Sequence, residues 1–103
     1  MQLSRVTLVA PGRAASAAVT PALVIDLIWA AADPADQVEH VAALGAPGLV
    51  EVGIFAQAES PETARRRACL LARRARDMSP LLGDWRVDCR DGVPCQRDRK
   101  SVV

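Results

Sequence analysis

Aromatic side chains are scarce in this chain, which has no tyrosine, one phenylalanine and two tryptophans among its 103 residues. Sheet surfaces that bind RNA stack the bases on several aromatic rings, and Phe55 alone cannot provide such a platform. Half of the residues are hydrophobic, but alanine supplies much of that fraction. Because a small side chain buries little area, we expect a thin core of modest stability.

Potential metal ligands are also few. The chain has one histidine, His40, and three cysteines, and their spacing matches no zinc motif. We therefore expect neither a metal site nor a cofactor. An odd number of cysteines in a reducing compartment predicts free thiols. The alternative is a disulfide between Cys89 and Cys95, which flank a turn.

No apolar run is long enough to span a membrane. The longest, residues 22–32, contains Asp26 and has about half the required length. The apolar stretch at 6–10 is too short for a secretory signal, so we expect a cytoplasmic protein. A formal net charge of +1 gives no reason to expect a nucleic-acid partner. The excess of alanine and arginine is typical of a GC-rich bacterial genome.

Hydrophobic periodicity divides the first 90 residues into strands and helices. Alternation of polar and apolar residues predicts strands at 4–10, 22–31, 49–57 and 84–90. Two helices are predicted to begin with a capping residue followed by proline, one running from Asp33-Pro34 to Gly45 and the other from Ser60-Pro61 to Met78. Residues 13–21 are predicted to form a loop or one short helical turn.

These segments predict a single α+β domain over residues 1–90, followed by a polar, basic and flexible tail at 91–103. Each strand has one apolar and one mixed face, so we expect helices on one face of a four-stranded sheet. The closest familiar architecture is a two-layer sandwich of the ferredoxin-like sort. The predicted order, strand-strand-helix-strand-helix-strand, departs from that fold, which has two strands between its helices.

The helix predicted at 61–78 is rich in arginine. Guanidinium groups bind carboxylates and phosphates bidentately, so this helix could bind an acidic partner. The same charges would also suit the solvated outer face of an amphipathic helix. Leu70 lies among the arginines, away from the apolar stripe, which favours a protein contact. The predicted partner-binding residues are Arg66, Leu70, Arg73 and Arg74.

The uncovered face of the predicted sheet is a second candidate surface. Its residues are too apolar for comfortable exposure to water and too charged for a core, so we expect a second copy of the chain to pack on it. A ligand pocket is the alternative, with Asp26 and Glu51 as acid/base groups and Arg86 as an anion anchor. The predicted residues of this face are Asp26, Ile28, Glu51, Phe55 and Arg86.

The sequence contains no catalytic cluster, phosphate-binding loop or internal repeat. We therefore predict a small non-catalytic accessory module that forms a homodimer and binds a larger protein. One alternative is a small enzyme or small-molecule-binding protein of the dimeric α+β-barrel type. Its pocket would lie between sheet and helices, near Trp29, Phe55 or Trp85. A second alternative is nucleic-acid binding through the arginine-rich helix, which the low net charge does not favour.

Overall fold

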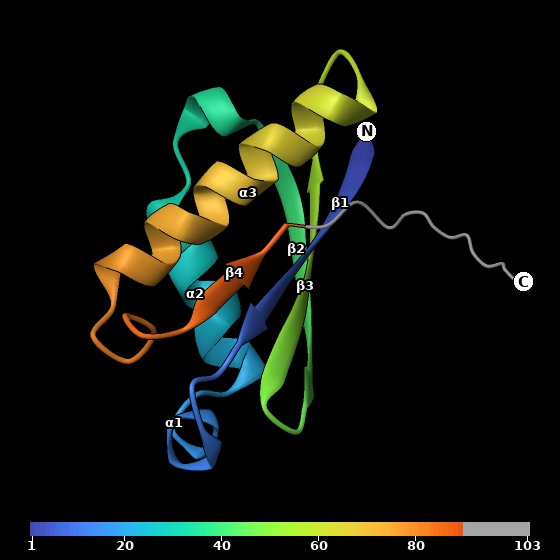
Figure 1. Cartoon of the computed structure of the whole chain (residues 1–103). Coiled ribbons are helices and arrows are strands. Elements are labelled where there is room, and N and C mark those ends of the chain that lie inside the picture. Colours follow the sequence, from blue (N-terminus) through green and yellow to red (C-terminus); the bar gives the residue numbers. More distant parts are fainter. Residues whose placement is uncertain (90–103) are drawn as a thin grey trace, which may run out of the picture.

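A computed structural model describes residues 1–89, which form a four-stranded antiparallel sheet with its two longer helices on one face (Figure 1). The elements are β1 (Gln2–Val9), α1 (Arg13–Ala17), α2 (Pro21–Ala31), the 3₁₀ turn η1 (Pro34–Asp36), β2 (Val38–Ala46), β3 (Leu49–Ala56), α3 (Pro61–Met78) and β4 (Arg86–Asp88). The strands lie in the order β2-β3-β1-β4. This order is that of a ferredoxin-like sandwich, so the predicted two-layer α+β fold is confirmed.

The segment predicted as a strand at 22–31 is the helix α2, and that prediction was wrong. Thr20 caps the start of this helix, and its hydroxyl accepts a hydrogen bond from the backbone of Leu23 at 3.1 Å. Proline follows it as the first residue of the helix. Its buried residues, Val24, Ile28 and Ala31, recur at helical spacing. A continuous apolar run fits a strand and a buried helix equally well, and the Thr20 cap was the signal that distinguishes them.

The prediction of a helix after Asp33 was also wrong beyond the first helical turn. Asp33 does cap that turn, in a reciprocal capping box with Asp36, but the turn ends at Asp36 and β2 follows. A β-bulge between Val38 and His40 interrupts the alternation of β2. Because of the bulge, Val38 and Val41 both face the core at a three-residue spacing that imitates a helix.

The hairpin of β2 and β3 supplies the second strand between the helices that the sequence prediction lacked. Its turn contains Pro47 and Gly48, and Gly48 has a φ of 78°. Proline before a glycine in this left-handed conformation is the pattern of a tight reverse turn, and glycine adopts it without steric cost. The departure from the ferredoxin-like order was therefore an error of assignment at residues 22–45.

The other predicted elements agree with the structure to within a few residues. β1, β3 and β4 occupy the predicted positions, and α1 is the short helical turn. α3 begins at Ser60, whose hydroxyl accepts a hydrogen bond from the backbone of Thr63 at 3.1 Å. Within residues 1–89, the helices lack the length and apolar character that crossing a membrane requires. The tail predicted at 91–103 lies outside the described residues.

The core lies between the inner face of the sheet and the helices α2 and α3. Aliphatic side chains from every layer fill it, including Leu8, Ile28, Ile54, Leu71 and Leu82. The buried face of α3 consists mainly of alanines at positions 64, 68, 72 and 75. Small side chains let a helix approach a sheet closely, so this sandwich is held by many small contacts and few large ones.

Ile28→Ala tests the helical placement of this residue in the core. Because Ile28 is fully buried, the substitution should lower the free energy of unfolding by about 2–5 kcal/mol. Met78→Ala, at a residue that is 51% exposed, should change it by less than about 0.5 kcal/mol. Urea denaturation followed by circular dichroism measures both values. Equal effects of the two substitutions would contradict this packing.

Candidate functional site

The open face of the sheet is made by residues that alternate with the buried residues of each strand. Glu51 and Phe55 on β3 and Arg86 on β4 lie on this face, as the sequence predicted. β2 adds His40 and Leu44, which the sequence analysis assigned to a helix. His40 and Phe55 are cross-strand neighbours, with ring centroids 5.5 Å apart.

Asp26 and Ile28 do not lie on the open face, and their assignment to it was wrong. Both belong to α2, which packs against the opposite face of the sheet. Ile28 is buried in the core, whereas Asp26 is exposed on the helix. Because the core separates Asp26 from Glu51, the two carboxylates cannot act as an acid/base pair.

A shallow hollow of about 370 Å³ lies on the open face over β1, β2 and β3. Leu3, Leu44 and Phe55 form much of its apolar lining, and Leu44 is 69% exposed. Gly53 also lines the hollow, and a Cβ atom at this position would come within 3.3 Å of Leu3 Cδ1. The Leu3 side chain therefore lies over Gly53, where a larger residue would crowd it.

Two charges of opposite sign lie in the same hollow. Arg5 on β1 pairs in register with Gly53, and Glu51 on β3 pairs with Thr7, so Arg5 and Glu51 are diagonal neighbours. The backbones of diagonal neighbours on adjacent strands are about 7–8 Å apart, a spacing that long side chains such as arginine and glutamate can bridge. Within residues 1–89 neither side chain forms a hydrogen bond or ion pair.

The second candidate surface lies on the outer side of α3. Arg66, Leu70 and Arg73 are all exposed, and their spacing places them on one helical face. Leu70 is 53% exposed, and neither arginine bonds to another side chain or carbonyl within the described part of the chain. The same residues line an open groove of about 350 Å³. Three of the four predicted partner-binding residues therefore lie together.

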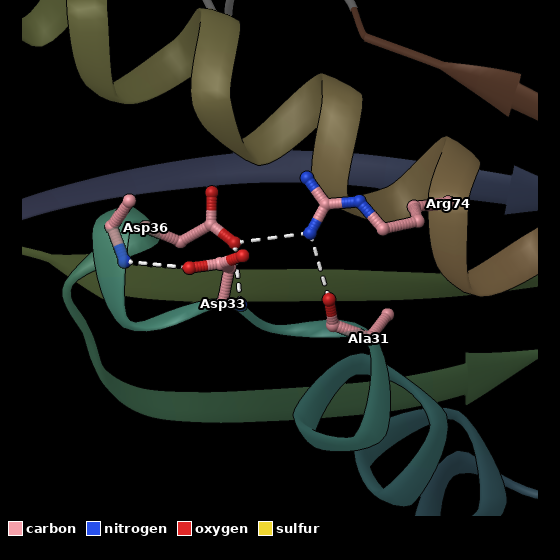
Figure 2. A network of polar contacts seen from close by, with 5 residues as sticks. Ala31, Asp33, Asp36 and Arg74 are labelled. Atoms are coloured by element: carbon pink, nitrogen blue, oxygen red, sulfur yellow. Dashed lines mark hydrogen bonds and ion pairs between the residues drawn. The ribbon is translucent and has the colours of Figure 1, made fainter.

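Arg74, the fourth predicted partner-binding residue, is exposed but reaches across to Ala31 and Asp36 (Figure 2). Its Nη1 donates hydrogen bonds to the carbonyl oxygen of Ala31 at 2.7 Å and to Asp36 Oδ2 at 3.2 Å. Asp36 Oδ2 also accepts a hydrogen bond from the backbone of Asp33 at 2.8 Å. Arg74 thus connects α3 to the end of α2 and to the η1 turn.

Two further arginines of α3 make local contacts. Arg67 donates a long hydrogen bond of 3.5 Å to the carbonyl oxygen of Gln57, and Arg76 pairs with Asp77 at 3.1 Å. Together with Arg74, these contacts engage three of the six arginines of α3 with groups of the protein itself, and Arg65 is not free either. The surface that remains for an external ligand is short, which weakens the case for nucleic-acid binding.

Cys69 on α3 and Cys89, directly after β4, form a disulfide with their Cα atoms 5.6 Å apart. The expectation of free thiols was therefore wrong for these two residues. The alternative pairing of Cys89 with Cys95 is also replaced, and Cys95 itself lies outside the described residues. Twenty positions separate the bonded cysteines, so no local spacing could reveal a contact that depends on where β4 joins the sheet.

Trp29, Phe55 and Trp85 do not converge on an internal pocket. Trp29 is 44% exposed on α2, Phe55 lies on the open face, and Trp85 is buried in the core. A void between the sheet and α3, lined by described residues, measures about 10 Å³, enough for one water at most. No group of three or more His, Cys, Asp and Glu residues within 1–89 is placed to hold a metal ion.

Arg74→Ala tests the structural role of this arginine. The substitution removes two hydrogen bonds and leaves the buried carboxylate of Asp36 without its cation, so it should cost about 1–2 kcal/mol of stability. Arg73→Ala, one residue earlier and without such contacts, should change the free energy of unfolding by less than about 0.5 kcal/mol. Chemical denaturation gives both values, and an equal loss in the two variants would contradict this division of roles.

Comparison of the chain with protein-family models, with curated proteins and with solved structures found no match. Function is therefore inferred from the sequence and from the geometry of these two surfaces.

Proposed function

We propose that this protein is a small non-catalytic interaction module that forms a homodimer through the open face of its sheet. A larger protein partner binds on the outer side of α3. The observation that carries the dimer is the placement of Arg5 and Glu51, which have no polar partner within residues 1–89 and lie among the apolar side chains of the open face.

A homodimer with two-fold symmetry needs a surface that is complementary to itself. When residue i of one copy contacts residue j of the other, residue j of the first copy also contacts residue i of the second. An interface that brings Arg5 against Glu51 of the partner subunit therefore contains the same pair twice. Both charges, unpaired within residues 1–89 of one chain, would be neutralised in the dimer.

The apolar residues around these charges supply the other component of the interface. Leu3 and Leu44 are exposed, and Phe55 is partly exposed, on three adjacent strands. Burial of apolar area favours association by roughly 25 cal/mol per Å² before the costs of immobilising two molecules are subtracted. Apolar burial thus supports the affinity of the two copies for each other. The Arg5–Glu51 pairs determine how the two sheet faces are aligned.

Charge reversal at Arg5 and Glu51 tests the dimer. Arg5→Glu and Glu51→Arg each place like charges opposite one another twice, so each variant alone should dimerise about 100-fold more weakly or worse. An equimolar mixture should form a heterodimer, because each protomer then offers the charge that the other needs. The combined variant R5E/E51R should recover the homodimer. Native mass spectrometry and sedimentation equilibrium measure these species.

Glu59→Arg and Arg73→Glu are matched controls, because they make the same charge changes at exposed residues away from the open face. Both should dimerise like the unmodified protein. A monomeric unmodified protein, or single variants that all dimerise without preference, would contradict the proposal. A monomer that retains a small molecule would instead support the alternative of ligand binding in the hollow.

The partner surface on α3 has a defined chemical character. Arg66 and Arg73 are seven residues apart, or about 10 Å along the helix axis, with Leu70 between them. Guanidinium groups prefer carboxylates that can accept two hydrogen bonds. The complementary partner is therefore an acidic protein surface in which an apolar side chain lies between two carboxylates.

Charge reversal on α3 tests this second surface. R66E/R73E should reduce capture of the partner about tenfold or more, because it places two carboxylates against an acidic surface. R67E/R76E is the matched control, with the same charge change on the same helix at arginines that make local contacts. Quantitative mass spectrometry of proteins copurified with each tagged variant, followed by binding of the purified partner, measures the effect. Equal capture by both variants would contradict the proposal.

We also propose that the protein works in the cytoplasm, as the sequence led us to expect. In that reducing compartment disulfides are usually transient, and they mostly serve catalysis or redox sensing. The Cys69–Cys89 disulfide is then unlike a permanent covalent staple of the kind found in secreted proteins.

A further inference from the structure

We propose that the Cys69–Cys89 disulfide is a thiol-exchange site, which is reduced by an anionic thiol bound in the arginine groove of α3. This inference rests on the proposed cytoplasmic location and does not depend on the sheet-face dimer.

The disulfide lies where a small thiol can reach it. Cys69 and Cys89 both line the open groove of about 350 Å³ on α3, and both residues are partly exposed. Attack on a disulfide requires access to one of its sulfurs, so exchange is slow at cystines that are covered by a core. A disulfide that forms part of the wall of an open groove meets this first requirement.

The charges around the disulfide favour an anionic reagent. Among residues 1–89, the groove is lined by Arg65, Arg66 and Arg73 and by one acidic residue, Glu62. Within the described residues Arg66 and Arg73 have no polar partner, so their guanidinium groups are available for a carboxylate of the incoming thiol. Nearby guanidinium groups also stabilise a cysteine thiolate, which is the leaving group of the exchange reaction.

We expect the fold to remain intact without this disulfide. β4 pairs with β1 from Arg86 to Asp88, and the neighbouring Trp85 and Val87 are buried in the core. The chain is also long enough to fold around its own apolar core without covalent links. Reduction should therefore leave the sheet and both helices in place, as a reversible reaction requires.

The reaction proceeds in two balanced steps. The thiolate of the first reagent molecule bonds to one cystine sulfur, the bond between the two cysteine sulfurs breaks, and the other cysteine leaves as a thiolate. A second reagent thiolate then attacks the reagent's sulfur in the mixed disulfide and releases the second cysteine. Two reagent thiols are oxidised to one disulfide, the cystine gains two electrons, and both cysteine thiolates take protons from solvent.

The test compares small thiols of different charge. The full chain carries Cys95→Ser, so that a third thiol cannot exchange with the pair. The probes are 3-mercaptopropionate, 2-mercaptoethanol and cysteamine, which are anionic, neutral and cationic respectively. Their rates are compared at equal thiolate concentration and an ionic strength of about 0.01 M, where charges act over about 30 Å. Each rate is divided by the rate of the same thiol with a small neutral disulfide, which removes differences in intrinsic nucleophilicity. Alkylation of the new thiols followed by mass spectrometry counts the reduced protein.

We expect the anionic thiol to react about five- to tenfold faster than the cationic one. R66Q/R73Q should abolish most of this preference, whereas the matched control R67Q/R76Q should retain it. Salt at about 1 M should remove the preference in every variant, because the screening length falls to about 3 Å. Circular dichroism of the reduced protein should match that of the oxidised protein.

Equal rates with all three thiols, or a preference that survives R66Q/R73Q, would overturn the proposal. A disulfide that is reduced only when the protein unfolds would also overturn it and identify a structural staple. Neither result would affect the dimer, which is measured by mass and charge reversal on the opposite side of the sheet.

Discussion

The contact between α3 and the sheet determines what both outer surfaces of this protein can present. α3 buries alanines at four positions, with Leu71 as its large core side chain. One layer of helices is therefore enough to cover the inner face of the sheet, and nothing within residues 1–89 covers the outer face. The apolar side chains on that outer face, with Leu44 among them, remain exposed on the single chain. A dimer would supply the missing second layer.

The sequence predicted the architecture better than it predicted the elements. Clear alternation identified β1 and β3, and a cap with a strong apolar stripe identified α3. The segment that becomes α2 is apolar on nearly every side, so its period carries little information. The bulge after Val38 gave β2 a helical spacing. The sequence analysis therefore predicted α2 as a strand and β2 as a helix, but the predicted two-layer architecture was still correct.

The sequence placed a candidate site residue correctly only where it also assigned the surrounding strand or helix correctly. Glu51, Phe55 and Arg86 lie in correctly assigned strands, so alternation placed them on the open face. Asp26 and Ile28 lie in the misassigned segment, so the same reasoning failed for them. Leu3 and Leu44, which line the hollow, were missed. Alternation along β1 could have found Leu3, whereas Leu44 required the hairpin register.

Arg73 and Arg74 show why composition alone could not separate structural from available arginines. Adjacent residues on a helix point about 100° apart, so Arg74 reaches Asp36 and the end of α2 while Arg73 lines the outer groove. The partner surface and the thiol-exchange site then share Arg66 and Arg73. An acidic partner bound across these residues would cover the disulfide and neutralise the charges that attract an anionic thiol. The two proposed activities would therefore compete for the same surface, and the proposed dimer, built on the opposite face of the sheet, would present two such grooves outward.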